Sequence, residues 1–345
     1  MAKETKEKMV KKRIEYIDIA KGIAIILVII GHTIPDGSFV KNYIYGFHMP
    51  LFFFVSGYFF RERPAKEFVT KQGVRLMLPY AVTAVGIIAL SVGKKVLQRN
   101  WSGAMHFLKV QSLAAAYGSG MDMPLYRGSG IIIPDIGAIW FLPAIFFGML
   151  IMNFALKCKH PWAVILVSAV AGMISVYFVW LPMSIQSGMT ASVFLYAGYL
   201  SRKYQIVEKL SRGWIVLIAI PLSVLGPCIF GYSVYASNSF RYGPVNLLFA
   251  FPGILVVLYI SKAIESYSPK INGCFRFFGA DTLIILCTHC LELKGLTLWR
   301  VRDSLAARYA GYAAAVYIAF IIIRVAAAAA VVYIKRRSKL LQRLF

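Results

Sequence analysis

Three residues that could do acid–base chemistry, Asp18, Lys21 and His32, lie within the first long hydrophobic stretch of the sequence. Charged or titratable groups at membrane depth are costly, so they are kept mainly for pairing, ligand contact or proton transfer. Lys21 and His32 are eleven residues apart, which places them on one helix face about 16 Å apart along the axis. Asp18 can reach Lys21 on that face. This pattern predicts an internal cation followed, about three turns later, by an imidazole that could accept a proton.

The end of this stretch leaves two interpretations of His32 open. A neutral imidazole there is a candidate general base, but an interfacial histidine hydrogen-bonded at a helix end is the alternative. Asp36 follows four residues later, after Pro35, and is a candidate for orienting the ring. Because Pro35 breaks the helix, solvation of Asp36 in the loop is an equal alternative.

Composition indicates that these residues belong to a polytopic membrane protein. The 345 residues are 59% hydrophobic and 15% charged, whereas soluble domains have roughly 45–50% apolar and about 25% charged residues. The net charge of +24 comes from basic residues between hydrophobic segments, with no basic domain. We therefore read them as topology signals and anionic-lipid contacts, and we expect no nucleic-acid partner.

The chain is expected to form one all-α bundle over residues 1–345, with about ten membrane helices and no cleavable signal peptide. A polar tail (1–12) and a basic amphipathic tail (335–345) flank it, and the Lys and Arg distribution places both in the cytoplasm. The longest connection, 97–136, could cover a site as a lid or re-entrant segment. The expected spans are 14–34, 43–60, 74–96, 137–156, 162–180, 183–200, 214–235, 245–264, 277–296 and 309–334.

Two adjoining motifs carry a resemblance to a known family. D-x-x-K-G-I-x-I-x-x-V-x-x-G-H over 18–32 is followed by F-H-M-P-L-F-F-F-V-S-G-Y over 47–58. Together they resemble the membrane acyltransferase-3 family and, within it, sugar O-acetylases similar to fucose 4-O-acetylase. The family signature is a basic residue eleven positions before a catalytic histidine, which Lys21 and His32 match. Many members have Arg at the first position, so Lys21 is a departure that the sugar O-acetylase branch shares.

Three further segments extend the resemblance. RERPAKEFVTKQGVRLMLPY (61–80) contains Lys71 and Arg75, which match a basic pair in the family and would suit the phosphates of coenzyme A. Ordinary topology-setting cations are the alternative. IGAIWFLPAIFF (136–147) resembles a W-F-L element, so Trp140 is a candidate for the acceptor path or for the interfacial aromatic belt.

The last segment, FFGADTLIILCTHC (277–290), resembles G-x-x-S/T-L-x-I-Y-x-x-H through Gly279, Thr282 and His289, while Cys287 departs from it. Thr282, Asp281 and His289 are expected to face the interior, as catalytic, pore-lining or structural groups. The CxxC spacing of this segment lies inside a hydrophobic stretch, where small apolar packing is favoured over a metal site.

The resemblance implies transfer of an acyl group, most simply acetyl, from coenzyme A in the cytoplasm to a hydroxyl of a cell-surface glycan or glycolipid. Acetyl-CoA would be a co-substrate, with no permanently bound cofactor and no metal. The expected partners are acetyl-CoA, the acceptor and the bilayer of the cell membrane, and a homo-oligomer is left open. A transporter or flippase, in which Asp18, Lys21 and His32 form a relay, is the alternative, because intramembrane charges also mark transport.

Overall fold

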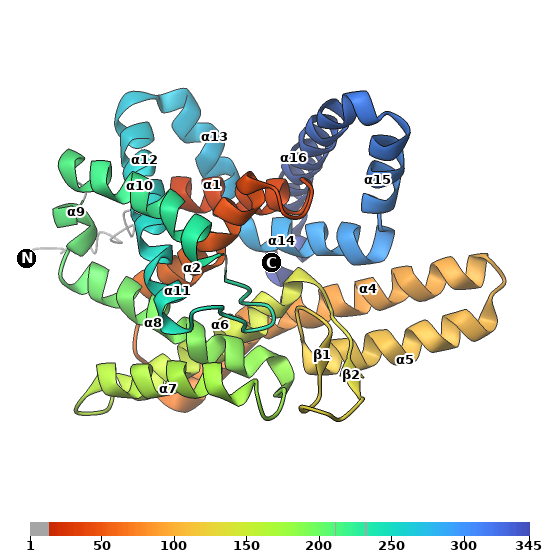
Figure 1. Cartoon of the computed structure of the whole chain (residues 1–345), viewed down its shortest axis with the longest axis horizontal. Helices are drawn as coiled ribbons and strands as arrows, with labels where there is room; N and C mark the ends of the chain where they lie inside the picture. Colours follow the sequence, from red (N-terminus) through yellow and green to blue (C-terminus); the bar gives the residue numbers. More distant parts are fainter. Residues whose placement is uncertain (1–13, 211, 232) are drawn as a thin grey trace, which may run out of the picture.

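The chain folds almost entirely into helices, as expected. The computed structural model describes residues 14–210, 212–231 and 233–345, so the polar tail predicted at 1–12 lies outside the described residues. Within the described ranges, the strands are β1 (Met123–Pro124) and β2 (Ile132–Ile133), which pair as one short antiparallel hairpin. Figure 1 shows this hairpin at the edge of an otherwise helical molecule. The all-α prediction is confirmed.

Helices cover each of the ten predicted hydrophobic stretches. The first half of the chain forms α1 (Glu15–Gly31), α2 (Phe39–Tyr58), α3 (Ala65–Gln72), the π-helical turn η1 (Gly73–Met77), α4 (Leu78–Leu97), α5 (Trp101–Tyr117), η2 (Ala138–Trp140), α6 (Phe141–Ala155) and α7 (Pro161–Ser175). The second half forms η3 (Pro182–Ser184), α8 (Ile185–Lys203), α9 (Ile206–Leu210), α10 (Gly213–Phe230), α11 (Pro244–Leu248), α12 (Ala250–Tyr267), α13 (Pro269–Ala280), α14 (Thr282–Cys290), the π-helical turn η4 (Leu291–Leu296), α15 (Trp299–Arg308), η5 (Ala310–Tyr312), α16 (Ala313–Arg337) and α17 (Lys339–Leu344).

Fewer helices than ten are long and apolar enough to cross a membrane. In the described part of the chain there are five, and a pair bent by 62° (Pro269–Ala280 with Thr282–Leu296) would make a sixth. A span needs about 20 residues, whereas α1 has 17 and α7 has 15. The multi-pass character is supported, while ten spans and cytoplasmic termini stay predictions. The five are Ala65–Leu97, Ala138–Ala155, Gly213–Phe230, Pro244–Tyr267 and Ala310–Arg337.

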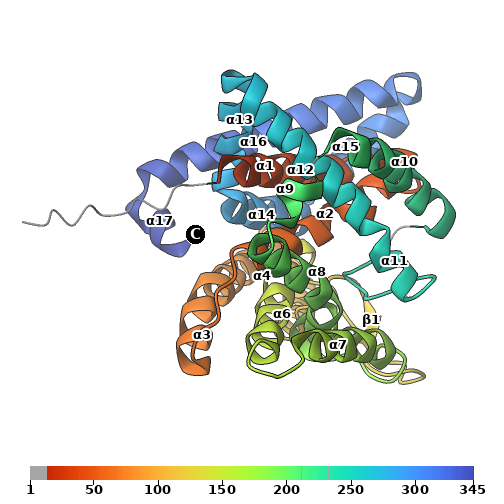
Figure 2. The ribbon, with the colours of Figure 1, turned by 90° about the vertical axis from the view of Figure 1, so that its left-hand side faces the viewer.

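Helix α1 is the central element of the bundle. It packs against α2, α12, α13, α14 and α16, and Figures 1 and 2 show it between α12 and α13 on one side and α14 on another. Its residues Ile17, Ile19 and Ala20 are fully buried. The polar groups of α1 therefore face protein, which is what makes charged side chains tolerable at this depth.

Small residues allow α1 and its neighbours to approach closely. A Cβ on Gly279 of α13 would lie 1.8 Å from the Asp18 carbonyl oxygen, and one on Gly22 would lie 2.0 Å from the Phe275 carbonyl oxygen. Close helix crossings through small residues are typical of membrane bundles, where dispersion contacts replace the hydrophobic effect between helices. The family-like Gly279 thus has a packing role next to the charged part of α1.

Three predicted segments differ from expectation. The stretch 277–296 is broken between α13 and α14 at Asp281, with a 62° bend. The connection 97–136 contains the helix α5, which packs along α4 as a projecting hairpin (Figure 1). The basic tail folds back as α17 at the end of α16 (Figure 2), and Leu341 and Phe345 pack against the core, so this tail also covers the bundle itself.

Candidate active site

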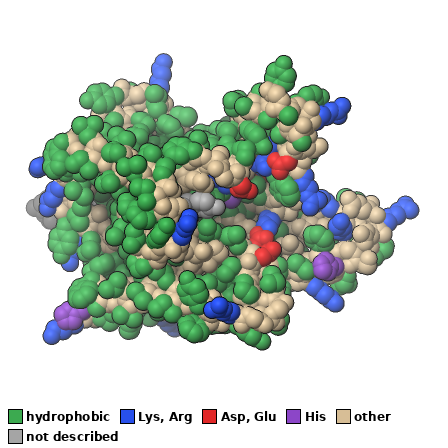
Figure 3. Space-filling view, in the orientation of Figure 1, with side chains coloured by type: hydrophobic (Ala, Val, Ile, Leu, Met, Phe, Trp, Pro, Cys, Tyr) green, Lys and Arg blue, Asp and Glu red, His purple; other side chains and the backbone are tan. Residues whose placement is uncertain are grey.

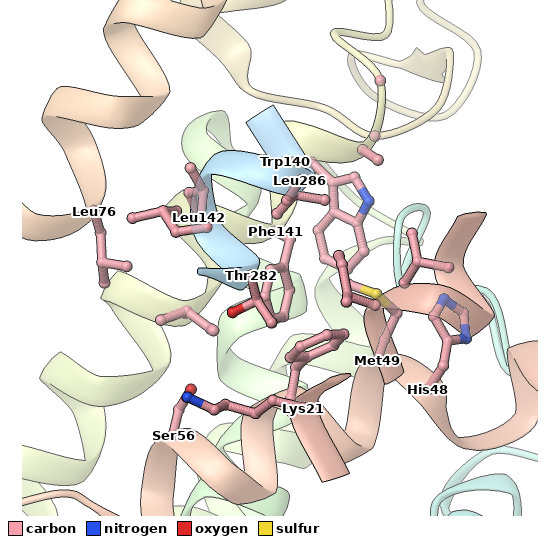
Figure 4. Close-up of a pocket in the computed structure, with 18 of the residues that line it drawn as sticks. Lys21, His48, Met49, Ser56, Leu76, Trp140, Phe141, Leu142, Thr282 and Leu286 are labelled. Atoms are coloured by element: carbon pink, nitrogen blue, oxygen red, sulfur yellow. The ribbon is translucent and has the colours of Figure 1, made fainter. Parts of the chain in front are cut away.

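One large cavity connects the two ends of α1. It measures about 1260 Å³, and its wall includes Asp18, Lys21, Val28 and His32 of α1. Figure 4 shows the side chains of Lys21, Thr282, Phe141 and Trp140 around this space, contributed by α1, α14, α6 and η2. Asp18, Lys21 and His32, the three α1 residues selected from the sequence, therefore line the same cavity.

The Lys21 end of the cavity is strongly basic. Lys21 Nζ lies 2.7 Å from Asp18 Oδ1, and the carboxylate of Asp281 accepts hydrogen bonds from Lys335 Nζ (2.7 Å) and Arg336 Nη2 (2.9 Å). Asp281, at the bend between α13 and α14, thus connects this bend to the end of α16 through ion pairs. The remaining cations that line this end are Arg61, Arg63, Arg75, Arg202 and Arg343.

The predicted donor pair, Lys71 and Arg75, is divided by the structure. Arg75 lines the cavity, whereas Lys71 pairs with Glu67 at 2.8 Å and its side chain is 59% exposed, outside the cavity wall. Lys71 belongs to the last turn of α3, whereas Arg75 belongs to the π-helical turn η1 that follows it. The expectation that the two residues act side by side therefore does not hold geometrically.

His32 caps the carboxyl end of α1 and lies in a cluster of aromatic and ionisable groups. Its Nδ1 is 3.4 Å from the Tyr45 hydroxyl, and its ring centroid is 5.6 Å from that of His289. His289 Nδ1 in turn lies 3.4 Å from Glu292 Oε2, and both residues are largely buried. The neighbouring His48 donates from Nδ1 to the Ile44 carbonyl at 2.8 Å, which commits that ring to the backbone of α2.

Two arginines hold the end of α1. Arg302 Nη1 donates to the carbonyl oxygens of His32 (3.0 Å) and Thr33 (2.7 Å). Arg324 Nη1 donates to the His32 carbonyl (3.1 Å) and to Thr33 Oγ1 (2.8 Å), while its Nη2 donates to Glu292 Oε1 (2.8 Å). The last carbonyls of a helix have no partner within the helix, and cations there also complement its dipole. The arginines therefore fix the backbone that carries His32.

Asp36 does not take the position expected for it. Its carboxylate pairs with Lys41 and its side chain is 95% exposed. Asp36 is therefore exposed in the loop and does not contact the His32 imidazole. The group found beside Nδ1 of His32 is the Tyr45 hydroxyl. The helix ends at Gly31 with His32 as its C-cap, so Asp36 belongs to the loop that follows and not to the helix that carries the ring.

The other predicted acceptor or pore-lining residues divide into two groups. Trp140, Thr282 and Asp281 all line the cavity, and Trp140 is 5% exposed. His289 lies behind the wall, next to His32. Sequence reasoning missed Tyr45 and Glu292, although the i, i+3 spacing of His289 and Glu292 could have indicated the latter.

Comparison with known proteins agrees with the geometry. A family model described as an acyltransferase domain matches residues 14–330, which include α1, most of the residues that line the cavity, and Arg302 and Arg324. Searches of curated proteins and of solved structures found no match. Because the family match covers nearly the whole chain and both Lys21 and His32 lie within it, this chain belongs to the membrane acyltransferase-3 family.

Proposed function

We propose that this chain is an acetyl-CoA-dependent O-acetyltransferase that modifies a hydroxyl of a cell-surface glycan or glycolipid, as the sugar O-acetylases that it resembles do. Family membership supports membrane acyl transfer in general. The observation that carries the finer proposal is the single cavity with a basic end around Lys21 and an imidazole, His32, at the other end. A donor whose phosphate head binds the cations around Lys21 would extend its thioester arm along the cavity to His32.

The basic end is suited to the donor. Arg61, Arg75, Arg202 and Lys335 face the cavity there, and guanidinium groups bind phosphate oxygens through paired, charge-assisted hydrogen bonds. Lys21, one step deeper and paired with Asp18, lies where the pantetheine arm would run toward His32. We therefore assign coenzyme A phosphates to this end and the thioester to the His32 end.

The chemistry at the far end follows from the neighbours of His32. The neutral imidazole takes the proton of the acceptor hydroxyl while the oxygen attacks the thioester carbonyl. The C–O bond forms, the C–S bond breaks, and the imidazolium proton passes to the departing thiolate. His289 lies beside the His32 ring, with 5.6 Å between the ring centroids, and contacts Glu292, while Arg302 and Arg324 hold the backbone that carries the ring.

The test uses the purified full-length chain in proteoliposomes with labelled acetyl-CoA. Release of coenzyme A together with a labelled glycan supports the proposal. His32→Ala, at equal abundance, should lose about 10²–10⁴-fold in rate. Mass spectrometry of surface glycans from cells with and without the gene identifies the product. Movement of a polar or lipid-linked solute without acyl-CoA consumption would instead indicate a transporter or flippase.

A further inference from the structure

The rim of the cavity at the His32 end carries a second group of cations. We call the following residues the distal rim: Lys94 and Lys95 at the end of α4, Lys294 in η4, and Trp299 and Arg300 at the start of α15. Lys294, Trp299 and Arg300 line the cavity directly. Figure 3 shows Lys and Arg side chains gathered between the α15 arm and the α4 hairpin. None of these residues belongs to the family-like motifs.

Contacts join the distal rim into one surface. Lys94 Nζ donates to Thr297 Oγ1 at 3.2 Å, and the Arg300 amide donates to the Thr297 carbonyl at 3.1 Å. Lys95 Nζ lies 5.4 Å from the centre of the Phe107 ring, which lines the cavity. The Arg300 guanidinium lies 5.3 Å from the centre of the Trp299 ring. Contacts with Thr297 and with the rings of Phe107 and Trp299 thus place the cations of Lys94, Lys95 and Arg300 at the same opening of the cavity.

Three of the four cations of the distal rim lack an ion-pair partner among the described residues. Lys294 pairs with Asp135, but for Lys94, Lys95 and Arg300 the described part of the chain supplies no carboxylate within ion-pair distance. Neighbouring like charges repel, and a bound anion relieves this repulsion. The aromatic face of Trp299, 37% exposed beside Arg300, adds an apolar surface on which a sugar ring can stack.

We propose, on the basis of the function proposed above, that the acceptor is an acidic sugar whose carboxylate or phosphate binds Lys94, Lys95 and Arg300. The sugar ring would lie on Trp299, with the hydroxyl that is acetylated directed into the cavity toward His32. The donor phosphates occupy the basic end around Lys21, so the two anionic substrates approach His32 from opposite ends. A neutral acceptor would leave the three cations without a counter-charge.

The proposal is tested by equilibrium binding to the full-length chain in neutral detergent without donor. The first pair of probes is a tetrasaccharide of alternating glucuronic acid and N-acetylglucosamine and its carboxyl-reduced form. The second pair is N-acetylglucosamine 1-phosphate and N-acetylglucosamine. At least one acidic probe should bind about tenfold or more tightly than its neutral partner, because charge-assisted contacts are worth at least that factor. A difference within the first pair indicates an acceptor with a carboxylate, and a difference within the second pair indicates an acceptor with a phosphate.

Variants locate the effect. The triple variant Lys94→Gln, Lys95→Gln, Arg300→Gln should abolish the acidic preference, while Arg308→Gln, at the exposed end of the same helix α15, should retain it. Acetyl-CoA binding should be unchanged in both. Equal binding within both pairs, no binding at millimolar probe, or retention of the preference in the triple variant overturns the proposal. Loss of acetyl-CoA binding in the triple variant would also overturn it. If the unmodified chain prefers the acidic probe but transfers no acetyl group from acetyl-CoA, the proposed function is contradicted and the acidic-sugar site is not.

Discussion

Replacing Arg324 with methionine tests whether the buried pair with Glu292 supports the structure around His32. The Arg324 side chain is 5% exposed and that of Glu292 is 14% exposed, with 2.8 Å between Nη2 and Oε1. Removing one partner of a buried ion pair leaves an uncompensated charge and costs about 3–5 kcal/mol. Arg324→Met should therefore lower the free energy of unfolding by about that amount.

The double variant with Glu292→Gln separates the charge from the other contacts. It removes the stranded carboxylate, so the remaining loss comes from the hydrogen bonds of Arg324 to His32 and Thr33. Two such bonds contribute roughly 1–3 kcal/mol together. We therefore expect the double variant to be more stable than Arg324→Met by about 2 kcal/mol. It should still transfer acyl groups slowly, because the end of α1 has lost one of its two guanidinium caps.

The measurement is reversible unfolding in mixed micelles, followed by helical circular dichroism, alongside coenzyme A release. Ile323→Met is the matched control, since Ile323 is 58% exposed on the adjacent position of α16. It should change stability by less than about 0.5 kcal/mol. The reasoning is refuted if Arg324→Met unfolds like the control, or if the double variant is less stable than the single one.

Three further pairs of variants test the donor end and its packing. Arg75→Ala should raise the half-saturating concentration of acetyl-CoA by about tenfold or more, whereas Lys71→Ala should leave it nearly unchanged; equal effects in a donor titration would contradict the division between them. Lys21→Arg should retain substantial activity and Lys21→Met should lose donor binding, measured by coenzyme A release and by acetyl-CoA titration. Gly279→Ala places a methyl 1.8 Å from a carbonyl oxygen of α1 and should destabilise the fold by about 1–3 kcal/mol in the unfolding assay, while Gly273→Ala, which meets no atom within 4 Å, should not.

The sequence predicted the part of the site that lies on one helix. Asp18, Lys21 and His32 are related by helical spacing alone, and the structure places all three on the wall of one cavity, with Asp18 and Lys21 paired. Hydrophobic runs likewise predicted a helix at every one of the ten stretches. Both inferences depend only on local periodicity, which a single sequence contains.

The support of His32 could not be predicted in the same way, because it is assembled from distant segments. Arg302 and Arg324 reach the end of α1 from α15 and α16, over separations of 269 to 292 residues, and Glu292 of η4 is joined to it through Arg324. No spacing rule relates these residues. The same limit explains Asp36, which is near His32 in sequence but pairs with Lys41.

The position of His32 at a helix end, and not in its middle, is what allows these distant groups to act on it. A mid-helix imidazole would have backbone carbonyls already bonded within the helix, leaving guanidinium groups nothing to bind there. At the end of α1 the free carbonyls of His32 and Thr33 accept from Arg302 and Arg324, and Arg324 also binds Glu292, which contacts His289. The carboxyl end of α1 thus connects His32 to residues in the last part of the chain. Substitutions of Arg302 in α15 and Arg324 in α16, which do not line the cavity, should therefore affect acyl transfer without touching either substrate.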